Sequence, residues 1–158
     1  MRVIGIDPGT GILGFGIIET TPAKKHPQLV DAGVIRTPAK QADAVRLGTI
    51  YDELSAIIAD TKPQEMAVET LFFAQNITTA MTVSQARGVV LLCGQQAGLP
   101  IFDYTPLQIK MALTGYGRAQ KSQIQEMVRV ILQLTAIPRP DDCADALACS
   151  ITHIMTMR

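Results

Sequence analysis

The chain has 158 residues, of which 47% are hydrophobic and 18% charged, and its formal net charge is zero. This composition excludes a disordered chain, and the length suffices for the core of one domain, which we expect to span residues 1–158. No apolar run is long enough to cross a membrane and no secretory leader precedes the first apolar segment, so we expect a soluble, cytoplasmic protein.

The balanced total hides an uneven distribution of charge. Residues 76–130 have a net charge of +3. Their basic residues are Arg87, Lys110, Arg118, Lys121 and Arg129, and their acidic residues are Asp103 and Glu126. Acidic residues gather instead near the two ends of the chain and along one early segment. A metal-dependent enzyme that acts on a phosphodiester requires a basic region beside an acidic cluster, although such a distribution also arises by chance.

The three cysteines predict neither a disulfide nor a zinc site. Cys93, Cys143 and Cys149 are odd in number, lie in apolar segments and form no C-x-x-C pair. We therefore expect buried free thiols.

The first apolar run, residues 2–6, predicts a short buried strand, and the residues that follow it match the dinucleotide-binding pattern G-x-G-x-x-G at Gly9 to Gly14. In a dinucleotide site these glycines open a helix. Here they recur every two or three residues among Ile and Phe, which disfavours a helix and favours a strand. We therefore predict a turn over residues 7–11 that joins two antiparallel strands, with Asp7 at the end of the first.

Residues 28–37 predict a third strand with a bulge at Gly33. Apolar spacing predicts a helix over residues 43–61, and residues 66–69 form a brief strand that ends in Glu69. Asn76 is a suitable cap for a helix through residue 96 that is apolar on most faces, and residues 100–104 predict a fifth strand.

Thr105 and Pro106 form a typical helix start, and a short helix to about residue 114 leads into a glycine-bearing loop at residues 115–117. An amphipathic helix follows around residues 124–132, and the last helix begins at Asp141 after Pro140. Three strands followed by alternating helices and strands predict an α/β fold with a mixed five-stranded sheet, in which an antiparallel meander continues into parallel strands reached through helical crossovers.

Acidic residues stand at functionally suggestive places in this scheme. Asp7 and Glu69 each end an apolar strand, and if these strands are neighbours both carboxylates lie at one edge of the sheet. Asp142 and Asp145 lie three residues apart and share one helix face. Clustered carboxylates without His or Cys favour Mg²⁺ or Mn²⁺, and two such ions support phosphodiester cleavage.

Each of these acids also has a plain structural interpretation. Asp141 suits a helix cap, Asp145 a first-turn acid favoured by the helix dipole, and Asp7 a turn residue. The spacing alone does not decide between Asp141 and Asp142 as a metal ligand.

Several motifs together resemble the RuvC-type Holliday-junction resolvases of bacteria. They are GIDPGT (Gly5 to Thr10), VETLFFAQN (Val68 to Asn76), SQARGV (Ser84 to Val89), KSQ (Lys121 to Gln123) and DDCADALACSITH (Asp141 to His153). The match is collinear and covers essentially the whole chain. It implies a ribonuclease-H-like fold and a homodimeric, Mg²⁺-dependent endonuclease that makes two symmetric nicks in four-way DNA junctions, alongside a branch-migration helicase complex of the RuvA/RuvB type.

By motif position, the resemblance assigns the catalytic acids to Asp7, Glu69, Asp142 and Asp145, and thereby selects Asp142 over Asp141. These acids would hold two Mg²⁺ ions per subunit, with Mn²⁺ as a possible substitute. On this interpretation the hairpin glycines keep bulk away from Asp7, so that metal and a DNA phosphate can approach.

The resemblance also suggests DNA contacts at Phe72 or Phe73, Lys110 and Lys121, and less directly at Arg87 and Arg118. An exposed Phe can stack on or wedge between bases, whereas the other of the pair packs in the core. Arg87 has an equally simple interpretation as a solvated or internally paired side chain. His153 fits a helix-surface or packing role better than that of a ligand.

Two alternatives to the resolvase hypothesis come from different classes. An actin-like ATPase or sugar kinase also begins with a strand, an Asp and a glycine-bearing phosphate turn, but needs a second domain for which 158 residues leave no room. A non-catalytic junction-binding protein would lack one or more of the four acids. A four-way junction has near two-fold symmetry, which a two-fold dimer matches, and we expect the apolar helix over residues 76–96 to form its interface.

Overall fold

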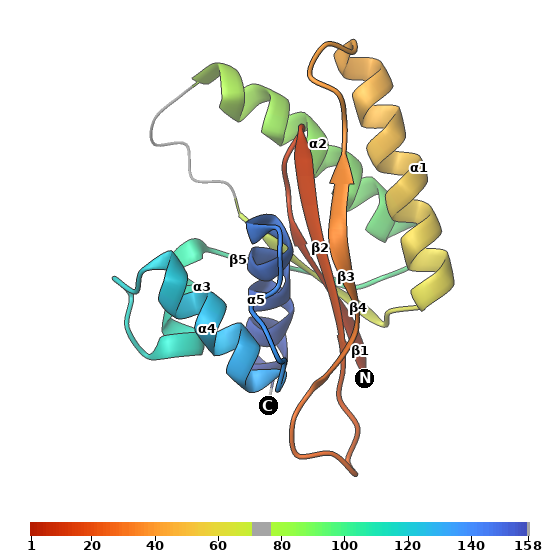
Figure 1. The fold of residues 1–158 in the computed structure, drawn as a ribbon. Coiled ribbons are helices and arrows are strands. Elements are labelled where there is room, and N and C mark those ends of the chain that lie inside the picture. Colours follow the sequence, from red (N-terminus) through yellow and green to blue (C-terminus); the bar gives the residue numbers. More distant parts are fainter. Residues whose placement is uncertain (71–76, 158) are drawn as a thin grey trace.

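The computed structural model describes residues 1–70 and 77–157, with the backbone alone at 77–79. A central sheet is covered by helices on both faces (Figure 1). The strands are β1 (Arg2–Asp7), β2 (Ile12–Glu19), β3 (Gln28–Arg36), β4 (Glu65–Glu69) and β5 (Ile101–Tyr104). The helices are α1 (Asp43–Thr61), α2 (Ile77–Gln96), α3 (Pro106–Thr114), α4 (Lys121–Ile131) and α5 (Asp141–Thr156).

The sheet has the order β3-β2-β1-β4-β5. Strands β1, β2 and β3 pair antiparallel, whereas β4 is parallel to β1 and β5 is parallel to β4. The predicted mixed five-stranded sheet is therefore confirmed. Because the parallel strands are reached through α1 and α2, these two helices cover one face, and α3, α4 and α5 cover the other (Figure 1).

The predicted bulge at Gly33 is wrong in position. Gly33 pairs in register with Phe15, and the shift occurs where Ile17 pairs with Asp31 but Ile18 pairs with Leu29, so that Val30 is the extra residue. Gly33 instead makes room for an aromatic ring, because a Cβ atom there would lie 3.0 Å from Cζ of Phe15. A glycine within a strand can mark either a bulge or the close approach of a neighbouring side chain, and the sequence alone does not distinguish the two.

Strand alternation divides the core into two clusters. Ile4 and Ile6 of β1 are completely buried against α1 and α2, whereas Val3 faces the cluster formed with α3, α4 and α5. Alternation therefore also directs Asp7 toward the face that α5 covers. Glu69 faces the same way, since Met66 and Val68 of β4 belong to the α1–α2 cluster and Ala67 to the other.

Glycines of β1 and β2 bring α5 unusually close to the sheet. A Cβ atom at Gly5 would lie 2.1 Å from the carbonyl oxygen of Ala146, and one at Gly14 would lie 2.0 Å from that of Asp142. At Gly16 a Cβ atom would lie 2.7 Å from the Leu147 side chain. The expectation that the hairpin glycines clear space for metal and phosphate is therefore wrong for Gly14 and Gly16, which clear space for the helix.

Local signals at the helix starts have mixed outcomes. The predicted start at Thr105 is confirmed, because Thr105 and Gln108 form a reciprocal capping box with Pro106 at the first helical position. The proposed cap Asn76 lies outside the described residues.

All three cysteines are free and buried, as expected. Among the described residues, no helix has the length and apolar character needed to span a membrane.

Candidate active site

Two carboxylates meet at the edge of the sheet where β1 and β4 end. The parallel register pairs Ile6 with Val68, so that the next residues along, Asp7 and Glu69, stand side by side. The condition on which the sequence argument depended, that these strands are neighbours, is therefore met. The carboxyl ends of parallel strands are where open α/β sheets bind ligands.

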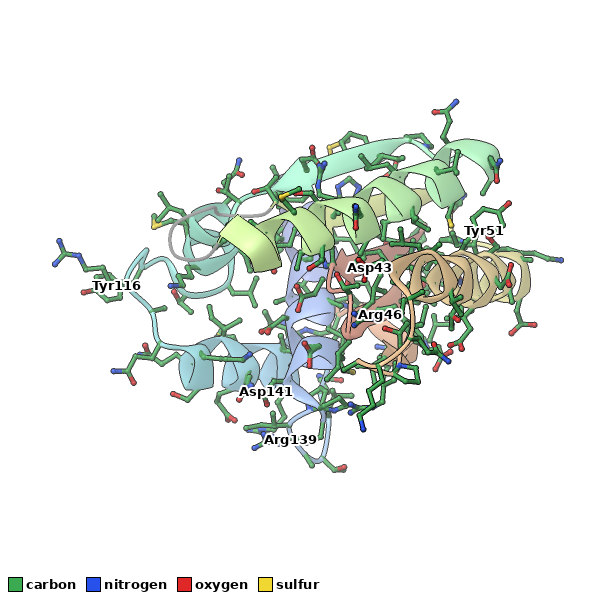
Figure 2. All side chains as sticks on the ribbon, turned by 90° about the horizontal axis from the view of Figure 1, so that it is seen from above. Asp43, Arg46, Tyr51, Tyr116, Arg139 and Asp141 are labelled. Carbon is green, nitrogen blue, oxygen red and sulfur yellow. The ribbon has the colours of Figure 1, made fainter. Side chains whose placement is uncertain are left out.

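A side chain of α1 stabilises the turn after Asp7 through Thr37. The hydroxyl of Thr37 donates a hydrogen bond to the carbonyl oxygen of Thr10 within this turn. Arg46 of α1 in turn donates from Nε to the Thr37 hydroxyl over 2.9 Å, and pairs with Asp43 one turn earlier (Figure 2). This chain of contacts holds the backbone of the turn that follows Asp7.

Helix α5 brings two further acids to the same end of the sheet. Asp142 and Asp145 lie in its first turns, and the backbone of Asp142 rests on Gly14 of β2. The alternative assignment of Asp141 as a helix cap is wrong, because Pro140 occupies the cap position and Asp141 begins the helix. Asp141 instead pairs with Arg139 at 2.8 Å (Figure 2) and lies 3.6 Å from Lys121.

These elements surround a cavity of about 240 Å³. Asp7, Glu69 and Asp145 line it together with two cations, Lys110 of α3 and Lys121 of α4. Its apolar wall consists of Pro106, Ile109, Ile124 and Ala148. Asp142 does not line the cavity, but its charge contributes to the raised pKa of Asp7.

Burial and mutual repulsion make the carboxyl groups of this cavity hard to ionise. Burial, followed by the charges of Glu69, Asp145 and Asp142, raises the pKa of Asp7 to about 8. Burial, followed by the charge of Asp145, raises the pKa of Glu69 to about 7. Burial also raises the pKa of Asp145, although its hydrogen bond with Lys121 acts in the opposite direction.

Lys121 supplies part of the missing positive charge. Its ammonium group donates a hydrogen bond to Asp145 over 2.8 Å. Burial alone lowers the pKa of Lys121, but the hydrogen bond and the charges of Asp145, Asp141 and Asp142 outweigh it and raise the pKa. A lysine in the first turn of a helix opposes the helix dipole, so this contact with the acids explains its presence better than helix stability does.

The donor set fits a hard divalent cation. Carboxylate oxygens without His or Cys are the ligands that Mg²⁺ prefers, and a cation bound among these buried acids would favour the ionised form that burial and mutual repulsion disfavour. Among the described residues, no three His, Cys, Asp or Glu side chains converge closely enough to form a complete metal-binding group. The acids thus lie around one cavity, but in the part of the chain that the structure describes no three of them are close enough together to bind a single ion.

The other predicted DNA-binding residues have separate locations. Phe72 and Phe73 lie outside the described residues. Arg87 of α2 pairs with Asp103 of β5 over 2.7 Å, which matches its internally paired interpretation. Arg118 is exposed on the loop between α3 and α4. Neither Arg87 nor Arg118 lines the cavity.

A buried hydrogen-bonded chain at the far end of α5 escaped sequence reasoning. His153 is completely buried, which confirms a packing role, and its Nδ1 lies 2.8 Å from the hydroxyl of Tyr104. Its Nε2 lies 2.5 Å from Glu65, and Phe102 packs on the ring at 4.6 Å between centroids. The chain ties α5 to β4 and β5. No local signal predicts it, since its partners are 49 and 88 residues away from His153 in sequence.

The strand order, the helices on both faces and the carboxylate cavity beyond β1 and β4 together define a nuclease of ribonuclease-H-like fold. Comparison with known proteins specifies the family. The family model described as Crossover junction endodeoxyribonuclease RuvC matches residues 3–153.

Individual relatives agree with the family model. The crossover junction endodeoxyribonuclease RuvC of Desulfitobacterium hafniense (strain DSM 10664 / DCB-2) is 54% identical over 153 residues, which cover 97% of this chain and 92% of that protein. The Thermus thermophilus RuvC structure has a TM-score of 0.93 at 36% identity and covers 100% of this chain and 96% of its own. T. thermophilus RuvC in complex with Holliday junction substrate has a TM-score of 0.94 at 37% identity, with coverage of 100% and 95%. The chain therefore belongs to the crossover junction endodeoxyribonuclease RuvC family.

Proposed function

We propose that the protein is an endonuclease that resolves four-way DNA junctions by paired, symmetric phosphodiester hydrolysis during homologous recombination and DNA repair. The observation that carries this proposal is the cavity itself, where Asp7, Glu69 and Asp145 meet, with Asp142 beside them. Family membership supports the choice of substrate, because one of the solved structures that this chain resembles is that of T. thermophilus RuvC in complex with Holliday junction substrate. The proposal places the enzyme in the cytoplasm, where its DNA is.

We infer that Asp7, Glu69, Asp142 and Asp145 hold two divalent cations per subunit, Mg²⁺ with Mn²⁺ as a substitute. Such ions, when bound, supply an activated water near neutral pH and stabilise the leaving oxygen. The chain's own groups prepare the site: burial raises the pKa of Asp7, so that a bound cation is needed to keep this carboxyl group ionised at neutral pH, and Lys121 holds Asp145 in place. The expected products are a 5′-phosphate and a 3′-hydroxyl.

Basic residues near the cavity are proposed to hold the DNA. Lys110 and Lys121 line the cavity and lie within reach of a phosphate there. Arg118 and Arg87 are candidates for phosphates farther along the strand, and Phe72 and Phe73 for contacts with bases at the crossover. Since phosphate contacts release counterions, junction affinity is expected to fall steeply with salt.

We propose a homodimer that uses α2, because two symmetric cuts need two sites related by a two-fold axis. Ala86 and Val90 of α2 are buried in the core, whereas Met81 is 63% and Leu92 is 48% exposed. Gly88 lies between these two, and a Cβ atom there would meet nothing within 4 Å. This exposed stripe would allow a second helix to approach closely. A branch-migration helicase complex of the RuvA/RuvB type is the further partner proposed.

Cleavage of a labelled synthetic four-way junction tests the proposal, with a linear duplex of matched sequence as the control. We expect paired symmetric nicks on the junction with Mg²⁺ or Mn²⁺, none with EDTA and none on the duplex. Tight junction binding without cleavage under any metal would contradict catalysis and leave a binding protein. Cleavage of the duplex at an equal rate would contradict the proposed substrate.

A further inference from the structure

An apolar surface with an aromatic residue lies beside the cavity and has no role in the proposed chemistry. Leu107 and Met111 stand one helical turn apart on α3 and are 60% and 49% exposed. The loop after α3 folds back onto them, since a Cβ atom at Gly117 would lie 2.6 Å from the Leu107 side chain. Tyr116 is 56% exposed at the tip of this loop. We call Leu107, Met111, Tyr116 and Gly117 the α3 apolar surface.

The backbone of Tyr116 is fixed while its ring points outward. Its N–H donates to the hydroxyl of Thr114 over 3.1 Å, and its carbonyl oxygen accepts from the N–H of Ala119 over 3.1 Å. Gly115, in the left-handed conformation with φ of 69°, ends α3 and sets the direction of the loop. With its backbone held in this way and only two side-chain torsions free, Tyr116 loses little conformational freedom when its ring contacts a ligand.

The charges around this surface suit a polyanion. Residues 104–125 contain Lys110, Arg118 and Lys121 and no Asp or Glu. Lys110 and Lys121 also line the carboxylate cavity, so the basic surface runs from the cavity to the loop. Because Gly117 packs on Leu107, the loop that carries Tyr116 stays beside α3, the helix that carries Lys110.

We propose that Tyr116 stacks against a base or sugar of the junction strand that leaves the cavity, a few nucleotides from the cut phosphate, while Arg118 holds a neighbouring phosphate. This inference rests on the proposed function, because the DNA must lie in the cavity for its flanking strand to cross the α3 apolar surface. A face that is apolar, aromatic and basic at once matches the bases and phosphates of a strand near a branch point.

The test is the affinity for a fluorescent four-way junction, measured in EDTA so that the DNA stays intact. We expect Tyr116→Ala to weaken binding roughly tenfold, as loss of one stacked base does, and Tyr116→Phe to bind within about twofold of the wild type. The Tyr116→Ala variant should keep the salt dependence, whereas Arg118→Gln should reduce its slope by about one.

Tyr51→Ala is the matched control. Figure 2 shows Tyr51 and Tyr116 at opposite ends of the molecule, and the hydroxyl of Tyr51 donates a hydrogen bond to Gln96 on α2. We expect this variant to bind like the wild type. With fluorescent base analogues placed one at a time at the positions that flank the cut site, at least one should be quenched by the wild type and by Tyr116→Phe but not by Tyr116→Ala.

Unchanged affinity and quenching in Tyr116→Ala would overturn the inference and leave this surface to another partner, such as an acidic protein. Equal weakening by Tyr116→Phe would overturn stacking and point to the hydroxyl. Because binding is measured without metal, a wild type that binds but does not cleave contradicts the proposed function alone.

Discussion

The carboxyl groups of Asp7 and Glu69 are placed where they destabilise the metal-free fold. Both end buried strands, and both have pKa values raised to about 8 and about 7 by burial first and by neighbouring acids second. Carboxyl groups that are hard to ionise at neutral pH do not stabilise the fold. Such an arrangement is typical of a site that binds a cation, whose charge favours the ionised form. Lys121 donates its hydrogen bond to Asp145, and its charge lowers the pKa values of Asp7 and Glu69 by less than burial and the neighbouring acids raise them.

This placement predicts how stability depends on pH. Because both folded-state pKa values lie above the unfolded values, the folded chain retains protons that the unfolded chain has lost. The free energy of unfolding in EDTA should therefore fall as the pH rises from about 5 to about 8, and then level off. Urea denaturation at a series of pH values measures it.

Two comparisons make the pH prediction specific. Asp7→Asn should flatten the decline, since the amide does not titrate. Mg²⁺ should stabilise the wild type more at pH 8 than at pH 6, because the ions compete with protons for the same oxygens. A metal-free free energy of unfolding that rises over this interval would contradict the raised pKa values.

At the scale of elements, the position of α5 determines the site. Gly5, Gly14 and Gly16 remove the side chains that would hold this helix away from β1 and β2, and its start carries Asp142 and Asp145. At its far end, His153 ties the helix to Glu65 of β4. The helix is thus fixed at both ends relative to the strands that carry Asp7 and Glu69.

Gly14→Ala should therefore disturb both stability and the site. The new Cβ atom would lie 2.0 Å from the carbonyl oxygen of Asp142, so the start of α5 must move. We expect a loss of about 2 kcal/mol of stability and weaker metal binding, measured by denaturation and by Mn²⁺ titration.

Gly48→Ala on α1 is the control for this substitution. A Cβ atom there would meet nothing within 4 Å, so the helix should gain about 1 kcal/mol with metal binding unchanged. Wild-type Mn²⁺ affinity in Gly14→Ala would show that the close approach does not position Asp142.

Element order and most boundaries could be predicted from the sequence, because periodicity and turn chemistry are local. Thr105 with Pro106, for example, specifies its helix start within a few residues. Long-range packing could not be predicted. The glycine at Gly33 accommodates the ring of Phe15, and Asp141 forms ion pairs where a cap was one interpretation. The four acids could be grouped from the sequence by their positions at strand ends and on one helix face. The contact of Lys121 with Asp145 could not be predicted, because the two residues lie 24 positions apart and meet only in the folded chain.

At the scale of the whole molecule, the two faces of the sheet have different tasks. Helices α3, α4 and α5 enclose the cavity, whereas α1 and α2 cover the opposite face (Figure 1). Dimerisation through the exposed stripe of α2 would leave the cavity free in both subunits. The two sites would then be related by the two-fold axis that the junction itself approximates.

Leu92→Glu should separate dimerisation from chemistry. Leu92 is 48% exposed on α2, and a charge there would be buried in the proposed interface. By light scattering at micromolar concentration, we expect a dimer for the wild type, a monomer for this variant and loss of paired nicking. Val130→Glu, at a 49% exposed position on α4, should remain dimeric. A monomeric wild type with full activity would exclude the dimer.

The most direct test of the metal-dependent nuclease site compares binding and cleavage in Asp7→Asn. The substitution removes one proposed metal ligand from the cavity while Lys110 and Lys121 stay in place. We predict junction affinity within about twofold of the wild type and no detectable cleavage with Mg²⁺ or Mn²⁺. Cleavage at the wild-type rate would contradict the assignment of Asp7, and with it the four-carboxylate metal site.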